Sequence, residues 1–129
     1  MKTTLALLAI LHAAPALAQT APAPANQPSP PDTWVPRTTA DLVLLEKLRA
    51  QPSQVSVRAG QQTQFGTLTI AVKSCVTRPP DLPQNSAAFL EITDSRNIAP
   101  VFRGWILSNT PSVSQLEHPV YDLRLVACR

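Results

Sequence analysis

Glycine and cysteine are scarce in this chain, and each shortage removes a class of function. The 129 residues include three glycines and two cysteines. The glycines lie far apart, so the chain has no glycine-rich loop that could cradle a phosphate. The cysteines are not spaced as C-x-x-C, the pattern of thiol redox sites. Nothing resembles a nucleophile elbow either. We therefore expect no enzyme activity.

Long apolar runs are also missing, and this bears on how the chain meets a membrane. The run from Leu5 to Leu11 is far shorter than the roughly 20 residues that a membrane span needs. Lys2 precedes it, and Ala16-Leu17-Ala18 follows it. A positive start, a short apolar core and an A-x-A site are the three parts of a secretory signal peptide. We predict that residues 1–18 are a signal peptide cut after Ala18, and that the mature chain is periplasmic and not inserted in the membrane.

Histidine and clustered charge are lacking as well. Only His118 remains after residue 18, so a metal site would need carboxylates from elsewhere, such as Glu91 or Asp94. The chain has 11 basic and 8 acidic residues. The basic residues are scattered and no aromatic ladder lies between them, which argues against nucleic-acid binding. We expect no metal, no other cofactor and no nucleic-acid partner.

Proline, in contrast, is abundant and is concentrated after the signal peptide. Residues 19–36 read QTAPAPANQPSPPDTWVP. This composition cannot bury enough apolar surface to offset the entropy lost on ordering, and we expect a disordered, extended tail. The tail is either a spacer or a docking ligand anchored by Trp34. Residues 37–129 then form a single domain.

The two cysteines, Cys75 and Cys128, are an even pair in a chain that we expect to be exported. Such pairs in an oxidising compartment are usually structural disulfides. Closing a loop of about 53 residues stabilises a fold by about 4 kcal/mol in the chain-entropy model. We predict one disulfide that holds a small domain together.

The start of the domain has the pattern of a helix. A hydroxyl cap and an acidic residue in the first turn are present at residues 38–41. Leu42, Leu45 and Leu48 then fall near one helical face, and Pro52 would end the helix. We predict one N-terminal helix here.

From residue 55 on, the apolar period changes to two, which predicts β-strands. In the last of them, Tyr121, Leu123 and Leu125 share one face, whereas Cys128 lies on the other. Five to six short strands with one helix indicate a mainly β fold, either a small barrel or a sandwich. The main predicted strands are 55–57, 68–75, 87–93, 100–107 and 120–128.

Residues 104–122 contain the polar side chains that could most readily bind a ligand or take part in catalysis. Thr110-Pro111 predicts the start of a short helical turn, and Pro119 would end it at His118. His118 can then cap the last carbonyl groups of that turn, which is a structural role. The alternative is a ligand site, for a small-ligand binder or a hydrolase, formed by Glu117, His118 and Asp122.

From Leu42 to Cys128 the chain resembles the DUF2155 family, an exported domain of unknown function found mainly in alphaproteobacteria. The departure is Arg124, where an aromatic residue is expected. The resemblance assigns no catalytic residue. Members are often encoded near an accessory subunit of respiratory complex I, which implies an association with that complex. The shared motifs are LEKL, FGTLTI followed by Cys75, AAFLEI, VFRGWILSNTP and LEHPVYDLRLVAC.

Taken together, these features favour a non-catalytic protein-binding or accessory module of an envelope or inner-membrane protein complex. It would dock through its tail and an exposed strand edge. Aromatic residues and arginine contribute most to the energy of protein interfaces. The candidate interaction surface is therefore Trp105, Arg103 and Tyr121, together with Trp34.

Overall fold

The computed structural model describes residues 33–129, so the predicted signal peptide and most of the predicted tail lie outside the described residues. This part of the chain forms eight strands and one 3-10 turn. The elements are β1 (Val35–Pro36), β2 (Thr39–Glu46), β3 (Gln51–Arg58), β4 (Gln62–Phe65), β5 (Leu68–Thr77), β6 (Ser86–Asp94), β7 (Phe102–Leu107), η1 (Pro111–Val113) and β8 (Tyr121–Cys128).

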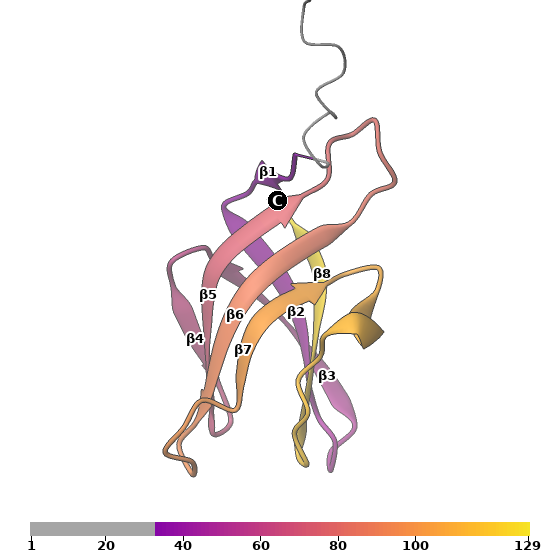
Figure 1. Cartoon of the computed structure of the whole chain (residues 1–129). Coiled ribbons are helices and arrows are strands. Elements are labelled where there is room, and N and C mark those ends of the chain that lie inside the picture. The colour runs from indigo at the N-terminus through magenta and orange to yellow at the C-terminus, as the bar shows by residue number, and fades with distance from the viewer. Residues whose placement is uncertain (1–32) are drawn as a thin grey trace, which may run out of the picture.

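The strands form two antiparallel sheets, which confirms a mainly β fold. Sheet A has the order β1-β5-β6-β7, with β4 paired to the remaining part of β5, and sheet B has the order β3-β2-β8. Figure 1 shows sheet A as a layer in front of β2, β3 and β8. In the described residues the two sheets remain separate and do not close into a barrel.

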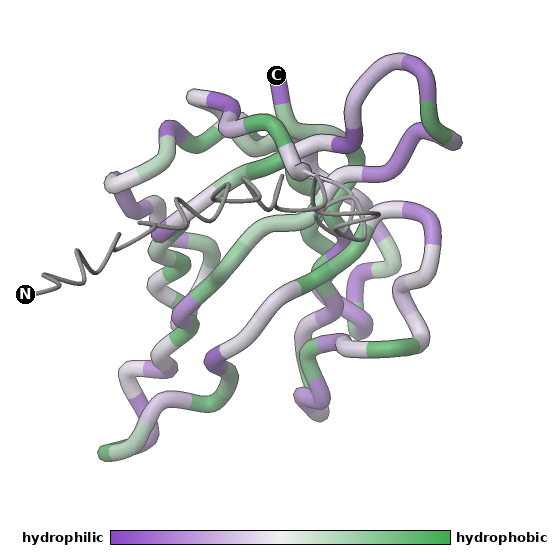
Figure 2. The backbone as a smooth tube through the Cα atoms, turned by 45° about the horizontal axis from the view of Figure 1, so that its top comes forward, coloured by the Kyte–Doolittle hydropathy of each residue, from purple (hydrophilic) through white to green (hydrophobic). Residues whose placement is uncertain are grey.

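The core lies between the two sheets and is made by alternate residues of their strands. Along β2 the residues alternate between buried and half-buried, the period that a strand with one face on the core requires. In Figure 2 hydrophobic and hydrophilic residues follow one another at short intervals along the strands. The largest fully buried side chains are Leu42, Leu44, Leu68, Ile70, Leu90, Ile92, Ile106, Leu123, Val72 and Cys75.

The predicted N-terminal helix is wrong, because residues 39–46 are strand β2. Leu42 and Leu44 face the core at 1% exposure, whereas Leu48 is 83% exposed in the turn that follows. A stretch of consecutive apolar residues fits both the helical and the strand period. Pro52, read as a helix stop, lies in β3 at the edge of sheet B, where a missing amide donor is tolerated.

One disulfide joins the sheets, from Cys75 of β5 to Cys128 of β8. Each strand has a register shift just before its cysteine, one between Val72 and Ser74 and one near Leu125. An extra residue in a strand moves the following side chains to the other face. Cys128 therefore faces the core, not the face opposite Leu125 as the simple alternation predicted.

The sheet begins earlier than the predicted domain boundary at residue 37. Val35 and Pro36 pair with Thr77 and Val76 at the edge of β5. The last residues of the predicted tail therefore belong to the fold. Within residues 33–129, no helix is long and apolar enough to cross a membrane.

Candidate functional site

An apolar groove lies on the outer face of sheet A, away from the core. Its floor is a row of three cross-strand neighbours, Val76 of β5, Ala87 of β6 and Leu107 of β7. The middle side chain is a single methyl group between two larger ones, which leaves a hollow of about 390 Å³. Trp34 and Trp105 complete its lining.

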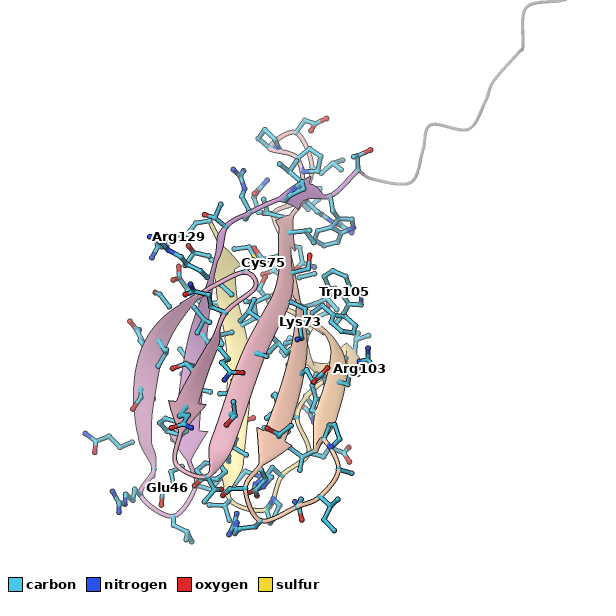
Figure 3. The ribbon with its side chains drawn as sticks, turned by 90° about the vertical axis from the view of Figure 1, so that its left-hand side faces the viewer. Glu46, Lys73, Cys75, Arg103, Trp105 and Arg129 are labelled. Atoms are coloured by element: carbon cyan, nitrogen blue, oxygen red, sulfur yellow. A yellow bond between two sulfur atoms is a disulfide. The ribbon has the colours of Figure 1, made fainter. Side chains whose placement is uncertain are left out.

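One wall of the groove is Trp105 of β7, the edge strand of sheet A. Its ring packs edge-to-face against Phe89, directly across on β6, with ring centroids 5.4 Å apart. This contact fixes the indole while 43% of the residue stays exposed. Figure 3 shows Trp105 and Arg103 on the same face of the sheet. Trp105, named from the sequence as part of the candidate interaction surface, is therefore partly exposed on the outer face of sheet A.

The other wall is Trp34, which immediately precedes β1. The guanidinium carbon of Arg78 lies 5.5 Å from the centroid of its ring, within cation–π range. Arg78 is in turn placed by its backbone amide, which donates to the carbonyl of Asn85 across the β5–β6 loop. The contribution of Arg78 was not visible in the sequence, since nothing in the local pattern links it to Trp34.

Tyr121 does not belong to this surface, which corrects the prediction. It lies in the core at 6% exposure, packs edge-to-face against Phe65 and accepts a hydrogen bond on its hydroxyl from the amide of Thr67. Its place in the alternation with Leu123 and Leu125 already indicated this inward face. Arg103 remains on the outer face, where it pairs with Glu91 at 3.7 Å.

The stretch around His118 forms a separate polar corner at the connection into β8. The 3-10 turn ends at Val113, so His118 does not cap it as predicted. Instead, His118 Nδ1 accepts hydrogen bonds from the amides of Val120 and Tyr121, at 3.1 and 3.2 Å. The ring proton therefore lies on Nε2, which is 3.1 Å from Asp94 Oδ2. Both ring nitrogens are used within the protein.

Asp94 is the buried anchor of this corner, at the end of β6. Arg96 donates to both of its carboxylate oxygens, from Nε at 3.3 Å and from Nη2 at 3.1 Å, and also from its amide. These hydrogen bonds, helped by the one from His118, hold the pKa of Asp94 well below its ordinary value. The carboxylate thus stays charged and ties the β6–β7 turn to the connection before β8.

The three residues of the predicted ligand site do line one depression, of about 570 Å³. His118 reaches it from a buried position at 7% exposure. The amine of Lys47 donates to the carbonyl of His118 at 2.7 Å, and Asp122 accepts from the amide of Leu123. Glu117 is exposed at the rim. No serine or cysteine is among the residues that line the depression.

Comparison with known sequences places this fold in a family. The sequence profile of a family described as "Uncharacterized protein conserved in bacteria (DUF2155)" matches residues 40–128. The chain belongs to the DUF2155 family. The match runs from the first core residue of β2 to the second disulfide cysteine, so it covers the two-sheet core, whereas Trp34 precedes it.

A relative of this DUF2155 protein is "Uncharacterized protein RP359" of Rickettsia prowazekii (strain Madrid E). The two are 26% identical over 94 residues, which cover 70% of this chain and 61% of the relative. The match thus spans less than two thirds of the relative's length. No solved structure matches the chain.

Proposed function

We propose that this DUF2155 protein is an exported, periplasmic, non-catalytic module that binds a protein of an envelope or inner-membrane complex. The observation that carries the proposal is the groove between Trp34 and Trp105 on sheet A. The resemblance to the family makes an assembly containing respiratory complex I the first one to test.

The chemistry of the groove supports a protein partner. Its lining is almost wholly apolar, with two indoles around Val76, Ala87 and Leu107. An indole is a frequent anchor of protein interfaces, because it buries a large area with few rotatable bonds. Arg103, which pairs with Glu91, and Lys73 are both exposed on the same sheet. A protein segment with apolar side chains fits this surface.

A second candidate function, binding or hydrolysis of a small ligand at the corner, has one observation in its favour. Glu117, His118 and Asp122 do line the same depression. The hydrogen bonds of His118 argue against this function. Both ring nitrogens already have partners within the protein, whereas a general base needs a free lone pair within reach of the substrate. The interface on sheet A is therefore the better supported of the two.

Photocrosslinking in intact cells tests the proposal. A photoreactive phenylalanine analogue replaces Leu107 in the groove floor or, as the control, Val126, which is 55% exposed on sheet B. We expect a discrete crosslinked protein from position 107 and none from position 126. Equal crosslinking from both positions, or none from position 107, would contradict the proposal.

A further inference from the structure

The open edge of sheet A lies beside the groove, on strand β7. Opposite residues of an antiparallel pair alternate between those that share two backbone hydrogen bonds and those that share none. The amide of Ser108 donates to the carbonyl of Ser86, a pair that continues the register of β6 and β7. Counting back from it, the residues whose amides and carbonyls point away from β6 are Arg103, Trp105 and Leu107. None of these backbone groups has a hydrogen-bond partner within residues 33–129.

The free backbone groups of β7 determine which kind of partner can bind there. A row of unpaired amides and carbonyls at a sheet edge is a template for another strand, because an extended backbone offers complementary groups at the same spacing. A helix cannot use this row, since its own backbone groups are bonded along the helix. The edge therefore favours an extended polypeptide segment.

The other sheet edges among residues 33–129 are less suited to this role. Proteins protect edges with short strands, proline and charged side chains. β1 has two residues and β4 has four, β3 contains Pro52, and β8 carries Asp122 and Arg124. β7 has six residues without a proline, and its one ionisable residue, Arg103, is paired with Glu91 of β6.

Apolar side chains flank the edge of β7 on both faces of the sheet. Trp105 and Leu107 lie on the outer face, where they line the groove. On the core side, a Cβ atom at Gly104 would point towards Ser114, which follows η1. Figure 1 shows η1 beside β7, and its Val113 is exposed. An added strand, whose side chains alternate between the two faces, would meet apolar groups on each of them.

We propose that the partner carries an extended segment that pairs with the free edge of β7 as a further strand of sheet A. Its backbone bonds to the free groups of Arg103, Trp105 and Leu107. Its apolar side chain beside Leu107 continues the row of Val76, Ala87 and Leu107 across the groove floor. This inference rests on the proposed function and adds the conformation of the bound segment and the backbone groups that hold it.

Mapping of crosslinked residues tests the pairing. The photoreactive phenylalanine analogue replaces Arg103 in one protein and Leu107 in another, and mass spectrometry identifies the partner residue that each position reaches. These positions are about 13 Å apart along β7. We expect the two partner residues to be about four positions apart, as in paired strands. A spacing of about nine positions, the number that a helix needs to cover this distance, would overturn the inference.

A matched pair of substitutions at position 103 tests the backbone contact. Arg103→Pro and Arg103→Ala both remove the guanidinium group, but only proline removes the amide that faces the edge. At equal thermal unfolding midpoints, we expect Arg103→Pro to lower the yield of crosslinking from position 107 about tenfold relative to Arg103→Ala, because a partner carbonyl is left unpaired. Equal yields would overturn the inference. If Arg103→Pro does not fold, the spacing of the crosslinks decides.

The same experiment separates this inference from the proposed function. A discrete envelope protein crosslinked at the wrong spacing, or insensitive to the proline, overturns the added strand and leaves the proposed function standing. Absence of any crosslinked protein from position 107 overturns both. A product that consists of two copies of this chain would show that a second copy occupies the edge, and it too would overturn the inference.

Discussion

The groove on sheet A and the corner around His118 differ in how far their side chains are already satisfied. At the corner, the ring of His118 and the carboxylate of Asp94 are buried and hydrogen-bonded within the protein. In the groove, two indoles and a row of apolar side chains face outwards, and Trp105 remains 43% exposed. The residues that looked most reactive in the sequence are hydrogen-bonded within the fold, whereas the apolar side chains of the groove face outwards.

The largest effect is expected from His118→Ala. This change removes the acceptor for two backbone amides and the buried donor to Asp94. Leaving such groups without partners costs about 2–4 kcal/mol of the free energy of unfolding. Urea denaturation measures the loss. Glu117→Ala, at the neighbouring exposed position, is the control and should stay within about 0.5 kcal/mol. Similar values for the two variants would refute a structural role for His118.

The next largest loss of stability is expected from a substitution of Gly66, whose backbone lies against the hydroxyl group of Tyr121. Gly66 has a φ of 58°, and a Cβ atom there would collide with the Tyr121 hydroxyl. Gly66→Ala should lower the free energy of unfolding by about 1–3 kcal/mol through strain and displacement of the tyrosine. Gly60→Ala separates the two causes, because Gly60 has a φ of 87° but open space around its Cβ position. Equal losses for both glycines would show that the tyrosine contact is unimportant.

A smaller effect on stability is expected from Trp105→Ala, because the ring is half outside the protein. Loss of its contact with Phe89 should cost about 1 kcal/mol. Thermal unfolding provides the measurement. A loss comparable to that of His118→Ala would mean that Trp105 holds the fold and would remove the contrast between the two regions.

A further effect is a dependence on acid pH. Arg96 keeps the pKa of Asp94 below its ordinary value of 3.8, and Arg129 and then Ser56 lower the pKa of Asp41. A carboxyl group whose pKa is lower in the folded state stabilises the fold above its ordinary pKa and loses that contribution as the pH falls through the folded value.

Thermal unfolding of the unaltered protein should therefore show a midpoint that falls below about pH 4. Asp94→Asn should lower the midpoint at neutral pH and flatten the decrease in acid. A variant curve that runs parallel to that of the unaltered protein at all pH values would show that Asp94 does not contribute through its charge.

The sequence predicted three strands of sheet A, β5, β6 and β7, together with the disulfide, because those features are local or countable, whereas β1 and β4 of the same sheet were not predicted. Period-two alternation is evident in residues 68–75 and 87–93, and two cysteines allow one pairing. It failed at β2, where Leu42 to Leu45 are all apolar and any period fits. Whether that stretch forms a helix or a strand depends on its pairing with β3 and with β8, and β8 is distant in the sequence.

The candidate site was predictable only in part, for the same reason. Strand alternation places Trp105 and Arg103 on one face of β7, but it does not say which face is exposed. Alternation also places Tyr121 on the same face as the apolar Leu123 and Leu125, although the sequence analysis assigned Tyr121 to the interaction surface. The contact between His118 and Asp94 joins residues 24 positions apart, and the cation–π contact joins Arg78 to Trp34. Such contacts are set by how the strands and loops are brought together, which no local pattern encodes.

The most direct test of the contrast is capture of a partner from solubilised envelope with matched variants. Tagged unaltered protein, Trp105→Ala and Glu117→Ala/Asp122→Ala are compared for one stoichiometric partner, at equal amounts of folded protein. We predict that Trp105→Ala loses the partner and that the double variant retains it. Loss of the partner from the double variant, with retention by Trp105→Ala, would contradict the assignment of function to the groove.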